Sequence, residues 1–162
     1  MKGNYKDGKR DGPYEWYFDD GSLHVKTNHK DGKEDGLWER YLSGQLYERK
    51  FFKNGKLNGF LETYYEDGNL KEKENFIDDK RDGLFEEYHD NGQLKTKGSF
   101  KDNKRDGPYD EFYDNGQLRV KGNFKDGKAY GFWEHFYKNG KLLLKHNTKD
   151  GKPDGLKEYF NK

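Results

Sequence analysis

Aromatic-rich runs alternate along the chain with short polar segments rich in Gly, Asp and Asn. Runs of about six to eight residues bounded by such segments are typical of β-strands joined by hairpin turns. No segment carries the 3.6-residue periodicity of an amphipathic helix. The pattern therefore predicts an all-β chain made of successive β-hairpins.

The hairpins recur at a fixed spacing. A first glycine series advances in steps of 24, 23, 24, 24, 24 and 24 residues, and a second series runs in step with it. A constant period of this size indicates a repeat array rather than an ordinary globular domain. We count offsets from the first glycine of each repeat. These glycines are Gly12, Gly36, Gly59, Gly83, Gly107, Gly131 and Gly155.

Several columns are defined by these offsets. Offset +3 is acidic in every repeat, and a Leu follows two residues after the second glycine, with a cation three residues later. Offset +5 is always aromatic: Tyr17, Tyr41, Tyr64, Tyr88, Phe112, Phe136 and Phe160. Four residues before each first glycine the chain has only Gly, Asn or Asp. Because these residues tolerate positive φ, we expect a left-handed turn position in every repeat.

The second repeat is one residue short and has Ser43-Gly44 where the others have Asp-Asn-Gly or a similar triplet. The simplest explanation is a hairpin loop of two residues instead of three. In that register Tyr41 faces Leu46, as Tyr88 faces Leu94, which gives an aromatic–aliphatic cross-strand pair in each complete hairpin.

These patterns predict an elongated, single-layer, twisted antiparallel meander of tandem hairpins with thirteen or fourteen strands. We expect residues 1–162 to form one array of about six and a half repeats that starts and ends within a repeat. Such an array is either a fragment of a longer one or pairs its ends with something else.

Strict alternation sorts the side chains onto two faces. We define face A by the +5 aromatics and the Leu column, and assign to it the +3 acids and the late aromatics Phe52, Phe76, Phe100 and Phe124. We expect face A to be the packed face, with the acids capping backbone N–H groups. We define face B by offsets +2 and +4, where a second aromatic column is expected to lie opposite the repeated Lys and Arg side chains. The members of that column are Tyr14, Trp38, Phe85, Tyr109 and Trp133.

The charge balance limits the possible partners. Lys and Arg number 32 and Asp and Glu 31, for a net charge of +1. This balance gives no support for nucleic-acid binding through bulk charge. No apolar stretch approaches 18 residues, and no signal peptide follows Met1, so we expect a cytoplasmic protein, with an N-terminal signal or anchor outside this chain left open.

No motif indicates catalysis. The chain has no cysteine, no P-loop and no nucleophile elbow, and its carboxylates recur with the repeat instead of forming one constellation. His24 and His29 share a strand but have no evident third metal ligand. We therefore expect a protein that is not an enzyme and has no metal or cofactor.

The segment Tyr113 to Leu142, and the whole chain from Lys2 onward, resembles the bacterial variant of the MORN repeat. The resemblance implies an extended sheet of aromatic-rich hairpins and supplies no catalytic residues. Arrays like this one resemble the YwqK family of toxin–antitoxin or immunity proteins. MORN repeats elsewhere are associated with phospholipid membranes and with scaffolding.

Positions that break the repeat are the best candidates for partner contacts, because residues required by the scaffold recur. Offset +4 and the position after the conserved Leu both vary and are both expected on face B. Aromatic residues and Arg are typical interface anchors. The candidates are Trp16, Arg40, Tyr47, Phe51, Trp133 and His135. Repeat 6 also has Ala129-Tyr130 where other repeats have Arg-Asp.

The leading hypothesis is a protein-binding scaffold, with an antitoxin or immunity role implied by the resemblance. A peripheral phospholipid-binding module and a structural or surface fragment of a larger protein are the alternatives. Oligomeric state and the identity of the partner stay open at this point.

Overall fold

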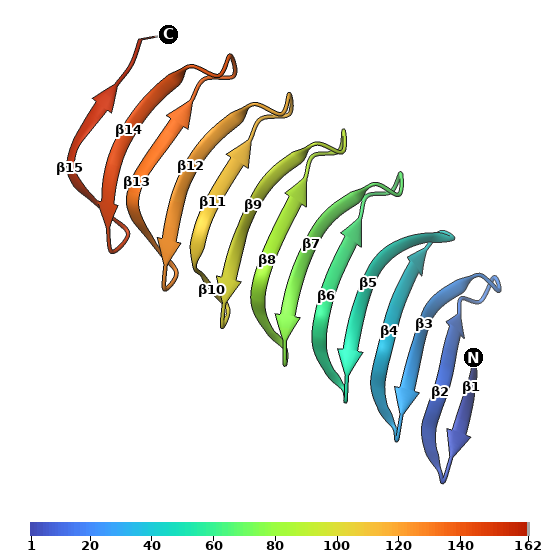
Figure 1. The fold of residues 1–162 in the computed structure, drawn as a ribbon. Coiled ribbons are helices and arrows are strands. Elements are labelled where there is room, and N and C mark those ends of the chain that lie inside the picture. Colours follow the sequence, from blue (N-terminus) through green and yellow to red (C-terminus); the bar gives the residue numbers. More distant parts are fainter. Residues whose placement is uncertain (162) are drawn as a thin grey trace. The chain divides into compact units, whose positions relative to one another are not determined.

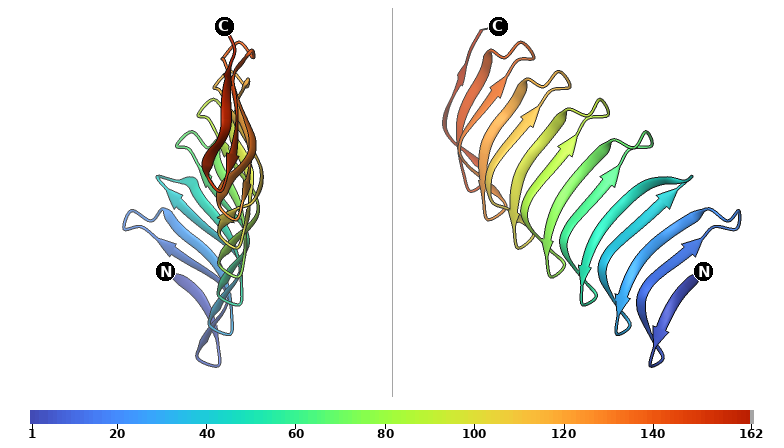
Figure 2. Two further views of the ribbon diagram at one scale, coloured as in Figure 1. Left: turned by 90° about the vertical axis from the view of Figure 1, so that its left-hand side faces the viewer. Right: turned by 45° about the vertical axis from the view of Figure 1, so that its right-hand side comes forward.

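The computed structural model describes residues 1–161, and Lys162 lies outside the described part. Its contacts divide the chain into an N-terminal unit, Met1–Lys80, and a C-terminal unit, Arg81–Lys162. Fifteen antiparallel strands and no helix are found in the described residues. The predicted all-β antiparallel meander of tandem hairpins is confirmed. Figures 1 and 2 show that consecutive strands within each unit lie side by side in one layer.

Strand order within each unit follows the sequence. The first seven strands are β1 (Lys2–Lys6), β2 (Lys9–Tyr17), β3 (Leu23–Lys30), β4 (Lys33–Leu42), β5 (Gln45–Lys53), β6 (Lys56–Tyr64) and β7 (Leu70–Ile77). The others are β8 (Lys80–Tyr88), β9 (Leu94–Lys101), β10 (Lys104–Arg105), β11 (Gly107–Phe112), β12 (Leu118–Lys125), β13 (Lys128–Phe136), β14 (Leu142–Lys149) and β15 (Lys152–Tyr159). The extra strand arises because Asp106 interrupts one strand and divides it into β10 and β11.

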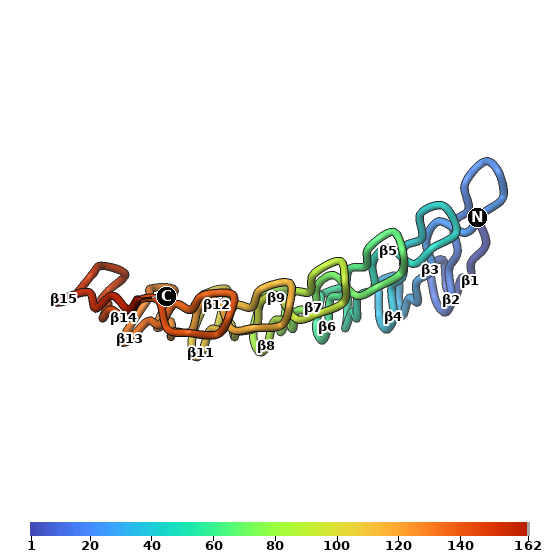
Figure 3. Tube along the Cα trace, turned by 90° about the horizontal axis from the view of Figure 1, so that it is seen from above, coloured from blue at the N-terminus to red at the C-terminus, as the bar shows by residue number. Residues whose placement is uncertain are grey.

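The longer hairpin loops lie along one edge of each unit, as the C-terminal unit shows in Figures 1 and 3. In the loop between β8 and β9 the N–H of Gly92 donates to the carbonyl of His89 at 2.9 Å, and Gly92 has φ 80°. A type I turn followed by a left-handed glycine is the expected three-residue loop. The short loop is also confirmed, because Ser43 and Gly44 both have positive φ and Tyr41 pairs with Leu46.

Two-residue turns lie along the opposite edge of each unit. The predicted left-handed column is confirmed in all seven turns: Gly8, Gly32, Gly55, Asp79, Asn103, Gly127 and Gly151 have φ between 67° and 85°. From the second turn onward, this residue also bonds back to the preceding repeat. In the C-terminal unit, for example, the N–H of Gly127 donates to the carbonyl of Arg105 at 2.8 Å. The hydrogen bonds therefore tie each turn to the strand one repeat earlier.

A β-bulge follows the conserved Leu in each hairpin and changes the assignment of the faces. In β9, Leu94 pairs with Tyr88 and Thr96 pairs with Glu87, so Lys95 is the extra residue. An extra residue shifts the alternation by one position. After the bulge, every side chain therefore lies on the face opposite to the one predicted by strict alternation.

Two predictions from strict alternation are consequently wrong. The late aromatics lie on face B, as shown by the pairing of Phe100 with Gly83 and of Phe124 with Gly107. The repeated cations lie on face A, because Lys97 pairs with Glu86 and Lys145 pairs with Glu134. The cations are therefore not the cross-strand partners of the second aromatic column.

Face B, not face A, is the packed face. Tyr14, Phe85 and Trp133 are 1%, 7% and 8% exposed. The Phe85 ring lies over Gly98, where a β-carbon would be 2.5 Å from the ring, and contacts Phe100 at 5.0 Å between centroids. The second aromatic column and the late aromatics together form this layer, and glycines beneath the rings allow close approach.

Face A carries alternating acids and cations. The expectation that its acids cap backbone N–H groups is wrong. In repeats 1 to 4 they accept hydrogen bonds from the +5 tyrosines, as from Tyr88 to Glu86 at 2.9 Å, and in repeats 5 and 6 they pair with Lys97 and Lys145. In the N-terminal unit Glu62 is buried and accepts from Arg49 at 2.5 Å and from Tyr64 at 2.9 Å, with Lys73 at 3.2 Å.

These contacts shift the pKa values of Glu62 and Tyr64. Burial alone would raise the pKa of Glu62, but the hydrogen bonds from Arg49, Tyr64 and Lys73 outweigh it and hold this pKa below its usual value. Burial and the neighbouring Glu62 carboxylate raise the pKa of Tyr64 to about 12.

The packed face can be tested with two adjacent aromatic residues. Trp133 is 8% exposed and Phe132, on face A, is 63% exposed. We expect Trp133→Ala to lower the free energy of unfolding by about 3–5 kcal/mol. Phe132→Ala should cost about 1 kcal/mol or less, because it removes an exposed ring and its contact with Lys145. Urea denaturation followed by circular dichroism measures both, and equal losses would contradict this assignment.

The Glu62 cluster predicts a pH-dependent stability. Because the pKa of Glu62 is lower in the folded protein, its stabilisation is complete above the unfolded value of about 4.3 and is lost as pH falls through the folded value. Glu62→Gln should therefore be less stable than the parent by about 1–3 kcal/mol at pH 7, and this difference should shrink at pH 3.

Glu134→Gln is the matched control, because the Glu134 side chain is 34% exposed and its Oε1 atom lies 3.8 Å from Lys145 Nζ. It should change stability by less than about 0.5 kcal/mol at pH 7. Urea denaturation of both variants at both pH values provides the comparison. A Glu62→Gln deficit of the same size at pH 3 as at pH 7 would show that ionisation of Glu62 is not its source.

Candidate functional site

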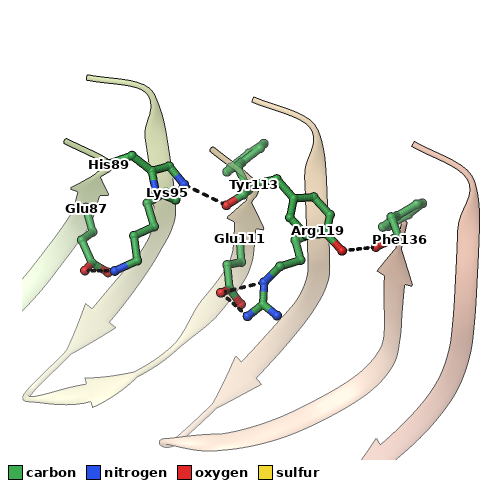
Figure 4. Close-up of polar contacts among 8 residues, drawn as sticks. Glu87, His89, Lys95, Glu111, Tyr113, Arg119 and Phe136 are labelled. Atoms are coloured by element: carbon green, nitrogen blue, oxygen red, sulfur yellow. Dashed lines mark hydrogen bonds and ion pairs between the residues drawn. The ribbon is translucent and has the colours of Figure 1, made fainter. Parts of the chain in front are cut away.

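The two variable columns meet at the bulge. On face B of the C-terminal unit, Lys95 Nζ lies 2.6 Å from Glu87 Oε1, and Arg119 makes an ion pair with Glu111 (Figure 4). In the N-terminal unit the corresponding pair is Arg40 and Tyr47, with the guanidinium 5.5 Å from the ring centroid. The predicted placement of both columns on face B is confirmed within each unit. The scaffold thus accepts either an ion pair or a cation–π pair at this position.

Tyr47 lines a hollow at the short loop, and the Arg40 guanidinium lies over the Tyr47 ring. This hollow has a volume of 430 Å³ and is lined by Leu42, Ser43, Gln45, Leu46, Tyr47, Tyr65 and Glu66. Tyr47 is 42% exposed. A volume of this size suits a small ligand or one large side chain of a partner. The combination of apolar walls, a tyrosine and an adjacent Arg is typical of interface anchor sites.

Leu42 also changes how this loop is tied to the next repeat. In the C-terminal unit the equivalent side chains bond forward: His89 Nε2 lies 3.1 Å from the carbonyl of Phe112, and the Tyr113 hydroxyl donates to the carbonyl of Phe136 at 2.8 Å (Figure 4). Leu42 has no polar side-chain atom and cannot make this bond. The sequence signal is that this column has Phe18 and Leu42 in the first two repeats and Tyr or His in the next four.

Two other candidates in the N-terminal unit lie apart from this pair. Trp16 packs at 4.7 Å from the Tyr14 ring and 5.4 Å from the Arg10 guanidinium, so packing contacts hold it on face B. Phe51 lies on face A, as its pairing with Leu37 shows, and its ring is 6.3 Å from that of Phe60. Phe51 therefore cannot share a flat binding surface with Arg40.

In the C-terminal unit, Trp133 belongs to the packed layer. The centroid of its ring lies 5.9 Å from that of Tyr109 and 5.2 Å from that of Phe124. The same ring covers Gly122, where no β-carbon would fit. The position of Trp133 is thus explained by packing, whatever else it contacts.

His135 forms a pair with His146 on face B. Their Nε2 atoms are 3.2 Å apart and their rings are stacked at 5.3 Å. Burial lowers the pKa of His135, and the nearby charges of His146, Arg119 and Lys157 lower it further, while Glu111 opposes them. His146 Nδ1 and Trp133 Nε1 are buried without a hydrogen-bond partner in the described part of the chain. Burial and these neighbouring cations therefore favour the neutral form of the His135 ring.

Within residues 1–161, no three His, Cys, Asp or Glu side chains are grouped closely enough to hold a metal ion. The same residues contain no helix of the length and apolarity that crossing a membrane requires.

A family model described as MORN repeat variant matches residues 10–31, 57–78, 81–102, 105–126 and 131–150, which is more than half of the sequence. The chain belongs to the MORN repeat variant family. The MORN repeats thus form a repeat scaffold. The stretch between the first two matches contains the short loop, with Arg40, Leu42 and Tyr47. No curated protein matches the chain.

Solved structures give only weak similarity. A TarM mutant from S. aureus in complex with fondaparinux, alpha-GlcNAc-glycerol and UDP has a TM-score of 0.41 and 11% identity, covering 59% of this chain and 19% of that one. A structure of TarM has a TM-score of 0.38 and 14% identity, covering 61% and 20%. A GtfA/B complex bound to UDP and GlcNAc has a TM-score of 0.33 and 12% identity, covering 83% and 27%. The chain thus matches about a fifth to a quarter of these proteins, and such scores support no argument about function.

The His135–His146 pair predicts an unusual titration. The His135 ring should titrate below about pH 6.5, the ordinary value, because burial and neighbouring cations disfavour its charged form. Since this pKa is lowered by folding, protonation destabilises the folded state as pH falls through it. In His146→Gln the midpoint should rise but stay below the ordinary value, because burial remains. NMR titration of the ring protons measures it, and a midpoint at or above the ordinary value would contradict the burial argument.

Proposed function

We propose that this chain is a protein-binding scaffold and not an enzyme, and that Arg40 and Tyr47 anchor its partner. The observation that carries the proposal is the hollow at the loop that is one residue shorter than its sister loops, because Tyr47 lines this hollow and Arg40 lies over the Tyr47 ring. A departure from the repeat, an exposed ring and a guanidinium coincide at one place. Interface energy usually concentrates in a few such residues.

The acids of the repeats support a scaffold rather than a catalyst. They are held in recurring structural contacts, as between Glu62 and Arg49 or between Glu111 and Arg119. Carboxylates in ion pairs along a sheet serve the fold and leave no isolated acid–base pair. This is the reason for proposing binding as the activity.

More finely, we propose an antitoxin or immunity protein of the YwqK type that neutralises a toxin by occlusion in the bacterial cytoplasm. The support is the resemblance of the repeats, together with a surface able to provide a standard interface of about 1,200–2,000 Å². A rigid scaffold needs little reordering on binding, which favours tight inhibition.

A phospholipid-binding module and a structural or surface fragment of a larger protein are the rival proposals. The turn lysines, such as Lys125, would carry membrane binding, but Asp residues alternate with them and weaken the attraction. Co-sedimentation with anionic liposomes at low and high salt distinguishes the first rival. A signal peptide or anchor encoded upstream would support the second.

The test is a calorimetric titration against the protein encoded by the neighbouring gene. Arg40→Ala combined with Tyr47→Ala should weaken binding at least about a hundredfold, because it removes two anchors of about 2 kcal/mol or more each. Circular dichroism should be unchanged, since both side chains are outside the packed layer.

Glu111→Ala combined with Arg119→Ala is the matched control, because it removes the equivalent pair in the C-terminal unit. It should leave the affinity within about threefold, as expected for an exposed ion pair away from the anchors. Lys125→Ala should change mainly the salt dependence and the association rate. Equal losses for the two double variants, or a dominant effect of Lys125, would reject the Arg40–Tyr47 site.

A further inference from the structure

One turn of the C-terminal unit lacks a side chain that its sister turns use. The residue just before the first glycine of each repeat is Asp in most repeats. The column reads Asp11, Asp35, Asn58, Asp82, Asp106, Tyr130 and Asp154. Repeat 6 thus has a phenol where its neighbours on both sides have a carboxylate.

The sister carboxylates have a defined role. Asp106 Oδ2 accepts a hydrogen bond from the backbone N–H of Asp126 at 3.1 Å, and Asp82 Oδ2 accepts from Asp102 at 3.4 Å. The same bond occurs twice in the N-terminal unit. There Asp11 accepts from Asp31 at 3.3 Å, and Asp35 accepts from Asn54 at 3.1 Å. In four turns, therefore, the first left-handed residue directs its N–H at a carboxylate from the preceding repeat.

The turn after Tyr130 has the same backbone but no such carboxylate. Its second residue, Gly151, still donates to the carbonyl of Ala129 at 3.0 Å. This turn is therefore attached to the preceding repeat by the same backbone bond as the other turns. Asp150 has φ 53°, like the equivalent Asp126 at 49°. The N–H of Asp150 is thus presented in the sister geometry, and Tyr130 cannot supply the carboxylate that accepts it.

A cavity occupies this place. It has a volume of 240 Å³ and is lined by Lys125, Asp126, Lys128, Ala129, Tyr130, Lys149 and Asp150. Its three lysines supply positive charge around the Asp150 N–H. Repeats 1, 4 and 5 have an Arg in place of Ala129, but this Arg turns onto face B, as Arg105 does over the Tyr109 ring at 5.0 Å. Loss of the Asp carboxylate therefore makes this edge more positive.

A second cavity lies beside the first and shares Tyr130 and Lys149 with it. Its volume is 310 Å³, and it is also lined by Gly131, Phe132, Asn147, Thr148 and Asp154. Phe132 is 63% exposed and Tyr130 is 50% exposed. The carboxylate of Asp154 is held by Asn147 at 3.1 Å. The second cavity thus offers two aromatic surfaces to an apolar group.

We infer that this edge binds an acidic peptide segment of a protein partner, with the carboxylate of an Asp or Glu side chain accepting the Asp150 N–H. The bound carboxylate replaces the one that Tyr130 removed, and the lysines pair with it. An adjacent apolar side chain enters the cavity between Tyr130 and Phe132. This inference rests on the proposed function, since it names the chemistry of part of the partner.

The choice of a carboxylate follows from the molecule itself. Four sister turns satisfy the same N–H with a carboxylate. The carboxylates of Asp126 and Asp150 line the same cavity and repel a phosphate dianion more strongly than a single negative charge. Three of the four sister turns hold their carboxylate beside an equivalent Asp, so the arrangement is compatible with one added negative charge.

The test is an NMR titration of the ¹⁵N-labelled chain with sodium acetate at constant ionic strength, followed by N-acetyl-Asp-Phe-amide. We expect the Asp150 amide proton to shift downfield and saturate. The amide of Asp126, already bonded to Asp106, should shift by less than about a fifth as much. The peptide should bind at least about fivefold more tightly than acetate, because its ring occupies the second cavity.

Two variants that exchange Tyr and Asp at this position between neighbouring repeats serve as matched controls. Tyr130→Asp returns the carboxylate, so the Asp150 amide should resonate downfield without ligand and its response to acetate should fall at least about tenfold. Asp106→Tyr opens the same site one repeat earlier, so the Asp126 amide should become responsive. The spread of the remaining amide signals reports whether each variant is folded, and Lys149→Gln, which leaves the turn unchanged, should weaken peptide binding about threefold.

Three results would overturn the inference: an Asp150 amide that does not respond, equal responses from Asp150 and Asp126, or tighter binding of inorganic phosphate than of the peptide. Binding of anionic phosphatidylserine vesicles with no peptide response would also overturn it in favour of a membrane. The Arg40 and Tyr47 double variant separates the two proposals. If it keeps the Asp150 response but the parent chain binds no protein partner, the proposed function fails while the carboxylate site stands.

Discussion

A sheet that forms a single layer must bury its aromatic rings against its own neighbouring strands. In each unit the rings on face B achieve this by lying over glycines, as Phe85 lies over Gly98 and Tyr14 over Gly3. Removal of the β-carbon lets the ring approach the backbone and bury both of its sides. The composition follows from this constraint, because aromatic residues supply large buried areas where aliphatic residues would need a second layer. The charged residues, 39% of the chain, can then occupy face A and the turns.

The same constraint explains why the repeat is so regular. From the second turn onward, each turn bonds to the strand one repeat earlier, as Gly127 does to Arg105, and an Asp carboxylate often adds a second bond. Such bonds link neighbouring repeats only, so stability accumulates from one repeat to the next. A substitution in one column therefore leaves the position of the next turn intact. Tyr130 illustrates this, because Gly151 keeps its bond to Ala129 although the carboxylate is gone.

The sequence was sufficient for the strands, the turn types and the pairing of the +5 residue with the conserved Leu, since each depends on local residues with a known conformational preference. Gly, Asp and Asn marked all seven left-handed turns, and the shortened loop set the pairing of Tyr41 with Leu46. The packed face was misassigned for one physical reason. A bulge after the conserved Leu shifts the alternation, which moves Phe100 to face B and Lys97 to face A. No residue type marks this bulge, because its column contains His, Tyr, Lys, Arg and Leu.

The candidate site was predictable in part, for a related reason. Departures from a column can be read from the sequence, and Arg40, Tyr47 and Tyr130 were identified in that way. Their consequences depend on what the missing residue does in the sister repeats, and only the structure describes those contacts. Leu42 lacks the polar side-chain atom with which His89 and Tyr113 tie one loop to the next, and a hollow is present at that loop. Tyr130 replaces an acceptor for a backbone N–H, and a cavity with three lysines is present there. In a repeat scaffold, a sister repeat therefore indicates which chemical group a variant position lacks, and hence which group a partner would supply.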